Sequence, residues 1–129
     1  MGKSAKSKSG ANSKSSASKP QLNCGTYVIQ KSDTGQKYVG RSSDVARRVD
    51  QHNAGNGAKW TAEAGAGWEI VKVYPGNNNA TETAITKGVM RNEGIANVRG
   101  GPYTKTHYPI TEFRAIKDAN GFTNLGNQK

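Results

Sequence analysis

The chain has 129 residues, which is enough for one domain with a modest hydrophobic core. Its formal net charge is +10, and its single cysteine excludes an internal disulfide and a cysteine-based zinc cluster. The sequence has neither the apolar core of a secretory signal nor a run long enough to span a bilayer. We therefore expect an intracellular protein, cytoplasmic or nuclear, that is not secreted and has no membrane contact.

Residues 1–20 are predicted to form a disordered basic tail, because residues 1–19 hold five lysines, seven serines and no acidic or aromatic residue. These lysines supply half of the net charge, and residues 20–129 still carry 14 basic against 9 acidic side chains. A basic domain with a basic arm favours nucleic acid as the partner, since lysine and arginine displace the counterions of phosphates. The alternative is that the charge only keeps the protein soluble.

Two short runs, GTYVI at 25–29 and KYVGR at 37–41, are predicted to form a β-hairpin. The residues between them include Asp, Thr and Gly, which are typical of a turn. Side chains alternate along a strand, so Tyr27 faces the same side as its neighbours two residues away. We expect Tyr27 and Tyr38 to lie close together across the sheet.

Residues 42–55 are predicted to form a helix, which Ser43 or Asp44 can cap. At about 100° per residue, one face of it carries two valines, an arginine and a histidine: Val45, Arg48, Val49 and His52. Arg47 points well away from this face, whereas Arg48 must reach a cleft or a partner at its edge. The alternative for Arg48 is that its long stem carries the charge out to water.

Residues 53–67 are rich in Gly, Asn and Ala and are predicted to be mostly loop or loosely helical. Here Lys59 is a candidate contact for nucleic acid, and Trp60 beside it either stacks on a nucleobase or covers the core. Residues 68–74 form the strongest predicted strand, which should pair with the hairpin. The expected fold is α+β: a small, three-stranded, mainly antiparallel sheet flanked by helices.

A second helix is predicted over residues 80–90, and Glu82 in it has two interpretations. With Asn79 as the cap, Glu82 occupies the third position of a capping box, which is a purely structural role. Alternatively, Glu82 shares a face with Ile85 and Val89, which would turn its carboxylate toward the sheet. A carboxylate in that place needs a cation, either a metal ion or an arginine.

The predicted core ends near VRGG at 98–101, where Arg99 lies beside a pair of glycines that can form a tight turn or approach a ligand. We divide the chain into the tail at 1–20, a core domain at 21–108, and a C-terminal extension at 109–129 with a possible short helix.

The order of these motifs resembles the GIY-YIG nuclease family over about residues 22–103. The motifs that carry the resemblance are GTY (25–27), YVGR (38–41), DVARRV (44–49) with a following His-Asn pair, GAKWT (57–61), WEIV (68–71) and VRGG (98–101). One departure is Thr26, which stands where isoleucine is usual in the family. It is a β-branched replacement that should cost little in activity.

The resemblance implies a metal-dependent DNA endonuclease that hydrolyses phosphodiester bonds. Tyr38 would be the general base or would orient the attacking water, and Tyr27 would support it by hydrogen bonding. Arg48 would hold the scissile phosphate. His52 would contact the phosphate or help the base. The alternative function is a non-catalytic nucleic-acid-binding module on the same scaffold.

The resemblance further implies that Glu82 holds the divalent metal, Mg²⁺ or Mn²⁺, with Glu93 as the less favoured candidate. A free tyrosine has a pKa of about 10, so a tyrosine base needs nearby cations, here Arg41 and Arg48. Further contacts with DNA are expected from three basic side chains: Arg41, Lys59 and Arg99. Because few residues lie outside the core, specificity would be low or would come from a partner protein or dimerisation.

Deleting residues 1–19 should weaken DNA binding and flatten its salt dependence, because five lysines are lost. The slope of log K against log salt should decrease in magnitude by at most about 4.5, at about 0.9 for each of the five possible phosphate contacts. Titrations of labelled DNA at several salt concentrations measure this slope. An unchanged slope would contradict the prediction, and complete loss of affinity would make the tail the binding element.

Overall fold

The structure, a computed structural model, describes residues 22–126, so the predicted tail at 1–20 lies outside the described residues. The elements follow one another in this order: β2 Gly25–Lys31, β3 Lys37–Ser42, α1 Val45–Asn53, α2 Lys59–Ala64, β4 Trp68–Tyr74, α3 Asn79–Glu93, the 3₁₀-helix η1 Ile95–Asn97, β5 Val98–Gly100 and α4 Ile110–Asn120. Within 22–126, no helix combines the length and the apolar character needed to cross a membrane.

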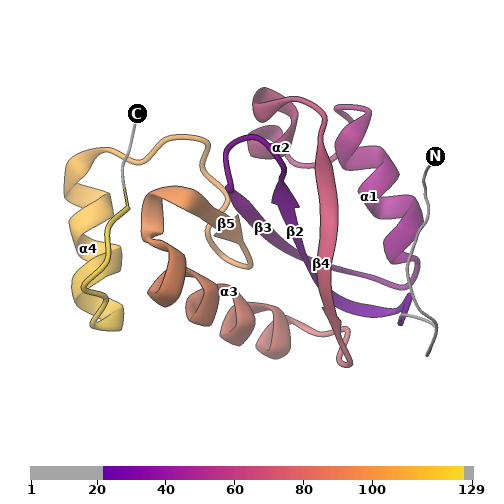
Figure 1. The fold of residues 1–129 in the computed structure, drawn as a ribbon. Coiled ribbons are helices and arrows are strands. Elements are labelled where there is room, and N and C mark those ends of the chain that lie inside the picture. Colours follow the sequence, from indigo (N-terminus) through magenta and orange to yellow (C-terminus); the bar gives the residue numbers. More distant parts are fainter. Residues whose placement is uncertain (1–21, 127–129) are drawn as a thin grey trace.

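The sheet has the strand order β4-β2-β3-β5 (Figure 1). Strand β2 is antiparallel to both β3 and β4, which confirms the predicted hairpin and its pairing with residues 68–74. The α+β fold is confirmed, but the sheet has four strands instead of three. The additional strand, β5, has three residues and runs parallel to β3. So short a segment has too little alternation to be predicted as a strand.

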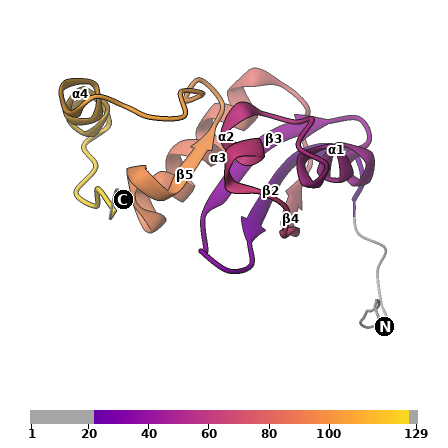
Figure 2. The same cartoon turned by 90° about the horizontal axis from the view of Figure 1, so that it is seen from above.

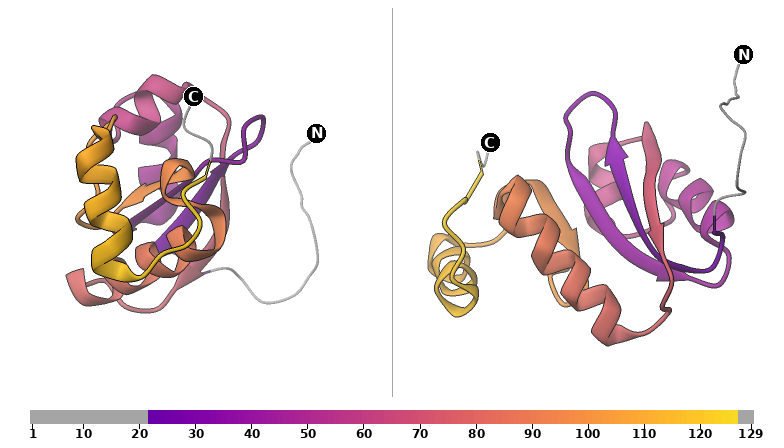
Figure 3. Two further views of the ribbon diagram at one scale, coloured as in Figure 1. Left: turned by 90° about the vertical axis from the view of Figure 1, so that its left-hand side faces the viewer. Right: turned by 60° about the horizontal axis from the view of Figure 1, so that its bottom comes forward.

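Helices cover both faces of the sheet. Helices α1 and α2 pack on one face, α3 packs on the other, and α4 is outermost, beyond α3 and β5 (Figures 2 and 3). The first apolar cluster joins the sheet to α1 and α2 and comprises Tyr27, Ile29, Val45, Val49, Trp60, Trp68 and Val73. The second joins α3 and β5 to the C-terminal residues and comprises Met90, Ile95, Val98, Tyr108, Phe113 and Phe122.

Helix α1 forms as the sequence predicts, and Asp44 is its cap. The carboxylate of Asp44 accepts a hydrogen bond from the backbone N–H of Arg47 at 3.2 Å. Both valines of the predicted face are buried, as is His52, whereas Arg47 is exposed.

The segment between α1 and β4 includes one short helix, α2, which brings Trp60 into the core. Only 7% of Trp60 is exposed, and its ring lies 5.9 Å from that of Trp68 between centroids. Of the two interpretations of Trp60, the structure supports packing in the core and not stacking on a nucleobase.

Helix α3 begins one residue earlier than the capping-box interpretation requires. Its cap is Asn78, whose side-chain oxygen accepts from the backbone N–H of Thr81 at 2.9 Å. Thr81, and not Glu82, therefore occupies the third position of the helix. The assignment of Asn79 as the cap was wrong, and with it the capping-box explanation of Glu82 is excluded.

The predicted C-terminal helix is confirmed as α4. Phe113 from this helix and Phe122 just beyond it are buried in the second apolar cluster. The chain then returns to η1, where the backbone N–H of Ala96 donates to the carbonyl of Leu125 at 2.8 Å. The extension thus packs against the domain.

Asn53, the last residue of α1, ties this helix to the start of β4. Its side-chain oxygen accepts from the backbone N–H of Gly67 at 3.0 Å and from that of Trp68 at 2.7 Å. Its amide also donates to the carbonyl of Trp68 at 2.9 Å. The loop containing α2 is closed by these three bonds.

Replacing Asn53 with alanine should lower the free energy of unfolding by about 2 kcal/mol, because three part-buried backbone groups lose their partner. Urea unfolding of both proteins measures the difference. Asn56→Ala is the matched control, since Asn56 is exposed in the same loop, and it should change stability by less than about 0.5 kcal/mol. Equal effects of the two substitutions would contradict this account of the loop.

Candidate active site

The candidate site forms where β5 stops pairing with β3. Strand β5 pairs only with residues 37–39, so the rest of β3 has no strand neighbour on that side. The start of α3 lies there instead, and Arg41 of β3 forms an ion pair of 3.6 Å with Glu82 of α3. An edge of β3 that is free of strand pairing is therefore available to functional side chains.

Tyr27 and Tyr38 lie on the same face of the hairpin, as the sequence predicts. Tyr27 pairs in register with Gly40, and Ile29 pairs with Tyr38, so the two tyrosines are diagonal neighbours. A Cβ atom on Gly40 would lie 2.4 Å from the Tyr27 hydroxyl oxygen. Because glycine has no side chain, the Tyr27 ring can lie across β3 at this position.

His52 of α1 is the side chain that both tyrosines contact. Its ring centroid lies 5.8 Å from that of Tyr27, edge to face, and 5.0 Å from that of Tyr38. The Tyr27 hydroxyl and the His52 Nε2 atom form a hydrogen bond of 2.8 Å. The hydrogen bond of Tyr27 thus goes to His52, although direct support of Tyr38 was expected.

His52 is 0% exposed, which rules out the expected direct contact with a phosphate. Burial, with a smaller effect from the Arg48 charge, lowers the pKa of His52 to about 4. The imidazole is therefore neutral at ordinary pH. It can act only through the groups to which it is hydrogen-bonded.

Thr61 of α2 is a site residue that sequence reasoning missed. Its Oγ1 atom lies 2.8 Å from His52 Nδ1, and its hydroxyl bonds to the carbonyl of Ala58 at 2.9 Å. Thr61 is 0% exposed. It belongs to the GAKWT segment, but nothing in a lone threonine reveals its contact, since its partner is nine residues away.

Arg48 lies at the edge of this cluster, as predicted. It is half-buried and donates to Gln51 Oε1 at 2.8 Å. Its charge lowers the pKa of both tyrosines and of His52, so it is close to all three. Arg47, the preceding residue, is exposed on the other side of the helix.

The expected cation Arg48 does lower the pKa of Tyr38, but in the protein alone the net shift is upward. Burial raises the pKa of Tyr38, the nearby Glu82 carboxylate adds to the increase, and Arg48 offsets it only in part. Burial likewise raises the pKa of Tyr27. Arg41 contributes its charge to Glu82 instead. Both tyrosines therefore keep their protons at neutral pH.

Glu82, and not Glu93, is the carboxylate near the tyrosines. The Glu82 side chain is 17% exposed, and burial raises its pKa against the opposing effect of Arg41. Glu93 lies eleven residues later in α3, about 16 Å along the axis at about 1.5 Å per residue. It is 42% exposed and pairs with Lys37 at 3.2 Å.

The donor set at Glu82 fits Mg²⁺ in one particular mode. Within the described part of the chain, no cluster of three or more His, Cys, Asp or Glu residues could enclose a metal ion. Mg²⁺, however, usually keeps several waters and binds through one or two carboxylates together with substrate phosphates. One partly buried carboxylate together with a substrate phosphate would meet this requirement.

The three expected DNA contacts have different surroundings. Lys59, the first residue of α2, is exposed. Arg41 is partly exposed, and its guanidinium donates a hydrogen bond to Asn79 Oδ1 at 2.9 Å. Arg99 is only 2% exposed, and it donates to three backbone carbonyls, those of Ile95, Val98 and Lys105. Its guanidinium does not reach the surface.

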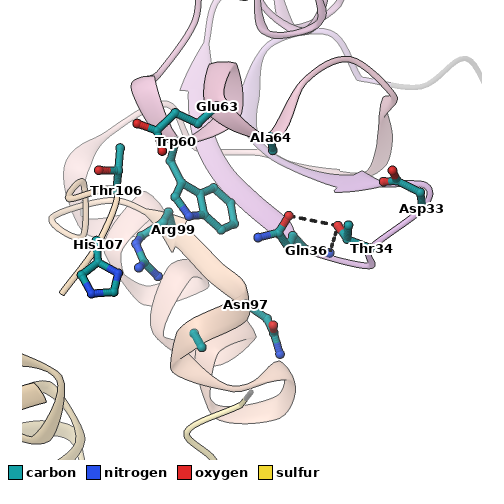
Figure 4. A pocket seen from close by; sticks show the side chains of 11 residues that line it. Asp33, Thr34, Gln36, Trp60, Glu63, Ala64, Asn97, Arg99, Thr106 and His107 are labelled. Carbon is teal, nitrogen blue, oxygen red and sulfur yellow. Dashed lines mark hydrogen bonds between the residues drawn. The ribbon is translucent and has the colours of Figure 1, made fainter. Parts of the chain in front are cut away.

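Arg99 also stacks between aromatic rings, with its guanidinium carbon 5.4 Å from the centroid of Trp60 and 4.8 Å from that of Tyr108. It borders a cavity of about 470 Å³ between the hairpin turn, α2 and η1 (Figure 4). Arg99 thus joins β5 and the residues after it to α2.

The small mixed sheet and its flanking helices thus bring tyrosine, arginine, histidine and glutamate side chains together around the hairpin. A family model described as the GIY-YIG catalytic domain matches residues 23–92, which is more than half of the chain. The chain belongs to the GIY-YIG family, and the resemblance noted from its motifs is confirmed.

Relatives of this chain bear the family name UPF0213. A UPF0213 protein of Halalkalibacterium halodurans is 31% identical over 90 residues, which cover 66% of this chain and 94% of the relative. One of Halobacterium salinarum is 60% identical over 35 residues, which cover 27% of this chain and only 44% of the relative. The names of these relatives state no activity. No solved structure was found to match the chain.

The depressed pKa of His52 makes stability depend on pH. The unfolded chain binds a proton at His52 below about pH 6.5, whereas the folded protein does so only near pH 4, so folding is favoured above this window. Between pH 7 and pH 5, His52 alone should lower the free energy of unfolding by about 2 kcal/mol. Urea unfolding at a series of pH values measures the slope.

His52→Gln should remove this part of the slope, although it lowers stability at neutral pH. His107→Gln is the control, because His107 is the other histidine of the chain and its side chain is exposed. A slope that survives in His52→Gln would show that another group causes it.

Proposed function

We propose that this protein is a metal-dependent endonuclease that hydrolyses phosphodiester bonds in DNA. The observation that carries the proposal is the convergence of five side chains from four elements around the hairpin: Tyr27, Tyr38, Arg48, His52 and Glu82. Membership of the GIY-YIG family supports it. The basic character of residues 20–129 favours a polyanionic substrate.

Arg48 binds the scissile phosphate in this mechanism. A guanidinium donates two parallel, charge-assisted hydrogen bonds to a phosphate and stabilises the charge that develops on it during attack. The half-buried position of Arg48 supports this role, because an ion pair is stronger where water is partly excluded. Its bond to Gln51 holds the guanidinium in place.

Tyr38 acts on the attacking water. Its raised pKa favours the role of orienting the attacking water through a neutral hydroxyl, whose oxygen accepts a hydrogen bond from that water. When a phosphate and a cation bind beside Arg48, the charges that affect the pKa of Tyr38 change. Tyr27 and His52 support Tyr38 from within the core, because the hydrogen bond between them is buried and fixed.

Glu82 would hold the divalent metal ion, which when bound stabilises the leaving oxygen as a Lewis acid. Its burial supports this role, because a carboxylate with a raised pKa gains from a neighbouring cation. Arg41 supplies that positive charge in the protein alone, at 3.6 Å from Glu82.

The test is incubation of the purified protein with supercoiled plasmid and with branched DNA, with Mg²⁺, with Mn²⁺ or with a chelator. Tyr38→Phe, Arg48→Ala and Glu82→Gln should each lower the cleavage rate by about a hundredfold or more. A chelator should stop cleavage. Salt-sensitive DNA binding without cleavage of any DNA form would overturn the proposal in favour of a non-catalytic binding module.

Two residues outside the site provide matched control variants. Arg47→Ala removes a neighbouring arginine that faces away from the site, and Glu93→Gln removes the second carboxylate of α3. Both should leave kcat within about threefold of the parent. If the controls lose as much activity as the site variants, the effects come from net charge or folding and the assignment fails.

A further inference from the structure

The hydrogen bonds of the Thr61 hydroxyl bear on which nitrogen of His52 carries the proton. A threonine hydroxyl has one proton to donate, and the proton of Thr61 goes to the carbonyl of Ala58 at 2.9 Å. Its contact with His52 Nδ1 at 2.8 Å can then be a hydrogen bond only if Nδ1 is the donor. The Nδ1–H tautomer follows from this count of protons.

The same count sets the direction of the hydrogen bond between His52 and Tyr27. When Nδ1 carries the proton of a neutral imidazole, Nε2 carries a lone pair and can only accept. Tyr27 must therefore donate its hydroxyl proton to Nε2 across the 2.8 Å contact. The oxygen of Tyr27 then has only lone pairs to offer to the rest of the site.

The backbone leaves the imidazole no space to turn or to gain a water molecule at Nδ1. A Cβ atom on Gly57 would lie 2.2 Å from Nδ1, so the loop at this residue packs directly against the ring. His52 and Thr61 are both 0% exposed. No solvent molecule can replace the Thr61 oxygen without rearrangement of this loop.

We propose that Thr61 is a positioning residue of the active site: it fixes the Nδ1–H tautomer of His52 and thereby makes Tyr27 present lone pairs, and not a proton, toward Arg48 and Tyr38. Its effect on catalysis rests on the proposed nuclease function, whereas the tautomer itself does not. A proton directed at the Arg48 side would face a positive charge, whereas lone pairs attract it.

The tautomer is measured directly by two-bond ¹H–¹⁵N correlation spectra of ¹⁵N-labelled protein at pH 7. The chain has two histidines, so His107→Gln assigns the signals of His52 by elimination. In the parent protein, Nδ1 of His52 should have the shift of a protonated nitrogen and Nε2 that of an unprotonated one. The reverse pattern, or two protonated nitrogens, would overturn the proposal.

Two variants and one control isolate the hydroxyl. Thr61→Val keeps the shape and removes the acceptor, so the proton of His52 should move at least in part to Nε2, whereas Thr61→Ser should keep the parent pattern. Thr26→Val is the control: Thr26 is also 0% exposed, and its hydroxyl donates to the carbonyl of Gly76 at 2.7 Å, away from His52. A Thr61→Val protein that retains the Nδ1–H tautomer would refute the assignment.

Cleavage kinetics test the consequence for the reaction. Thr61→Val should lower kcat by about tenfold to a hundredfold, as expected when the partner behind a catalytic side chain is removed. KM for DNA should stay within about threefold, since Arg48 is untouched, and Thr61→Ser should restore kcat. A shifted tautomer with unchanged kcat would refute the positioning role. If the parent protein cuts no DNA, the proposed function fails, but the spectra still decide the tautomer.

Discussion

The hydrogen bond between Tyr27 and His52 is the interaction on which the rest of the site depends. It lies inside the first apolar cluster, where the ring of His52 is wholly buried. A buried imidazole with a satisfied acceptor and donor costs little, whereas the same ring left unpaired would be strongly destabilising. The core and the candidate site are therefore one structure, and a change that loosens either one must affect the other.

The shortness of β5 matters as much as this bond. A longer strand would pair with the second half of β3 and cover the edge at which Arg41 and Glu82 now meet. Instead, α3 passes there, and its first turn brings a carboxylate to the end of the hairpin. Arg99 explains how so short a strand is held, because its buried guanidinium bonds to carbonyls before, within and after β5.

The sequence predicts those parts that depend on local pattern. The hairpin, both main helices and the inward face with Arg48 and His52 follow from periodicity and turn chemistry, and they are confirmed. The role of Thr61 could not be predicted, since it arises from contacts with a ring nine residues away. The expectation that Arg99 contacts DNA differs from the structure for a similar reason. An arginine beside two glycines suggests a surface contact, and only the folded chain shows the aromatic rings that enclose it.

Burial has two opposite consequences at this site. It keeps His52 neutral, which suits a fixed acceptor for Tyr27, but it also raises the pKa of Tyr38 and of Glu82. Arg48 and Arg41 offset these increases only in part, so the protein alone lacks the positive charge that an ionised Tyr38 would need. In the proposed mechanism, a divalent cation bound at Glu82 would add that charge. On this proposal, the cation would supply the positive charge that the two arginines do not supply in the protein alone.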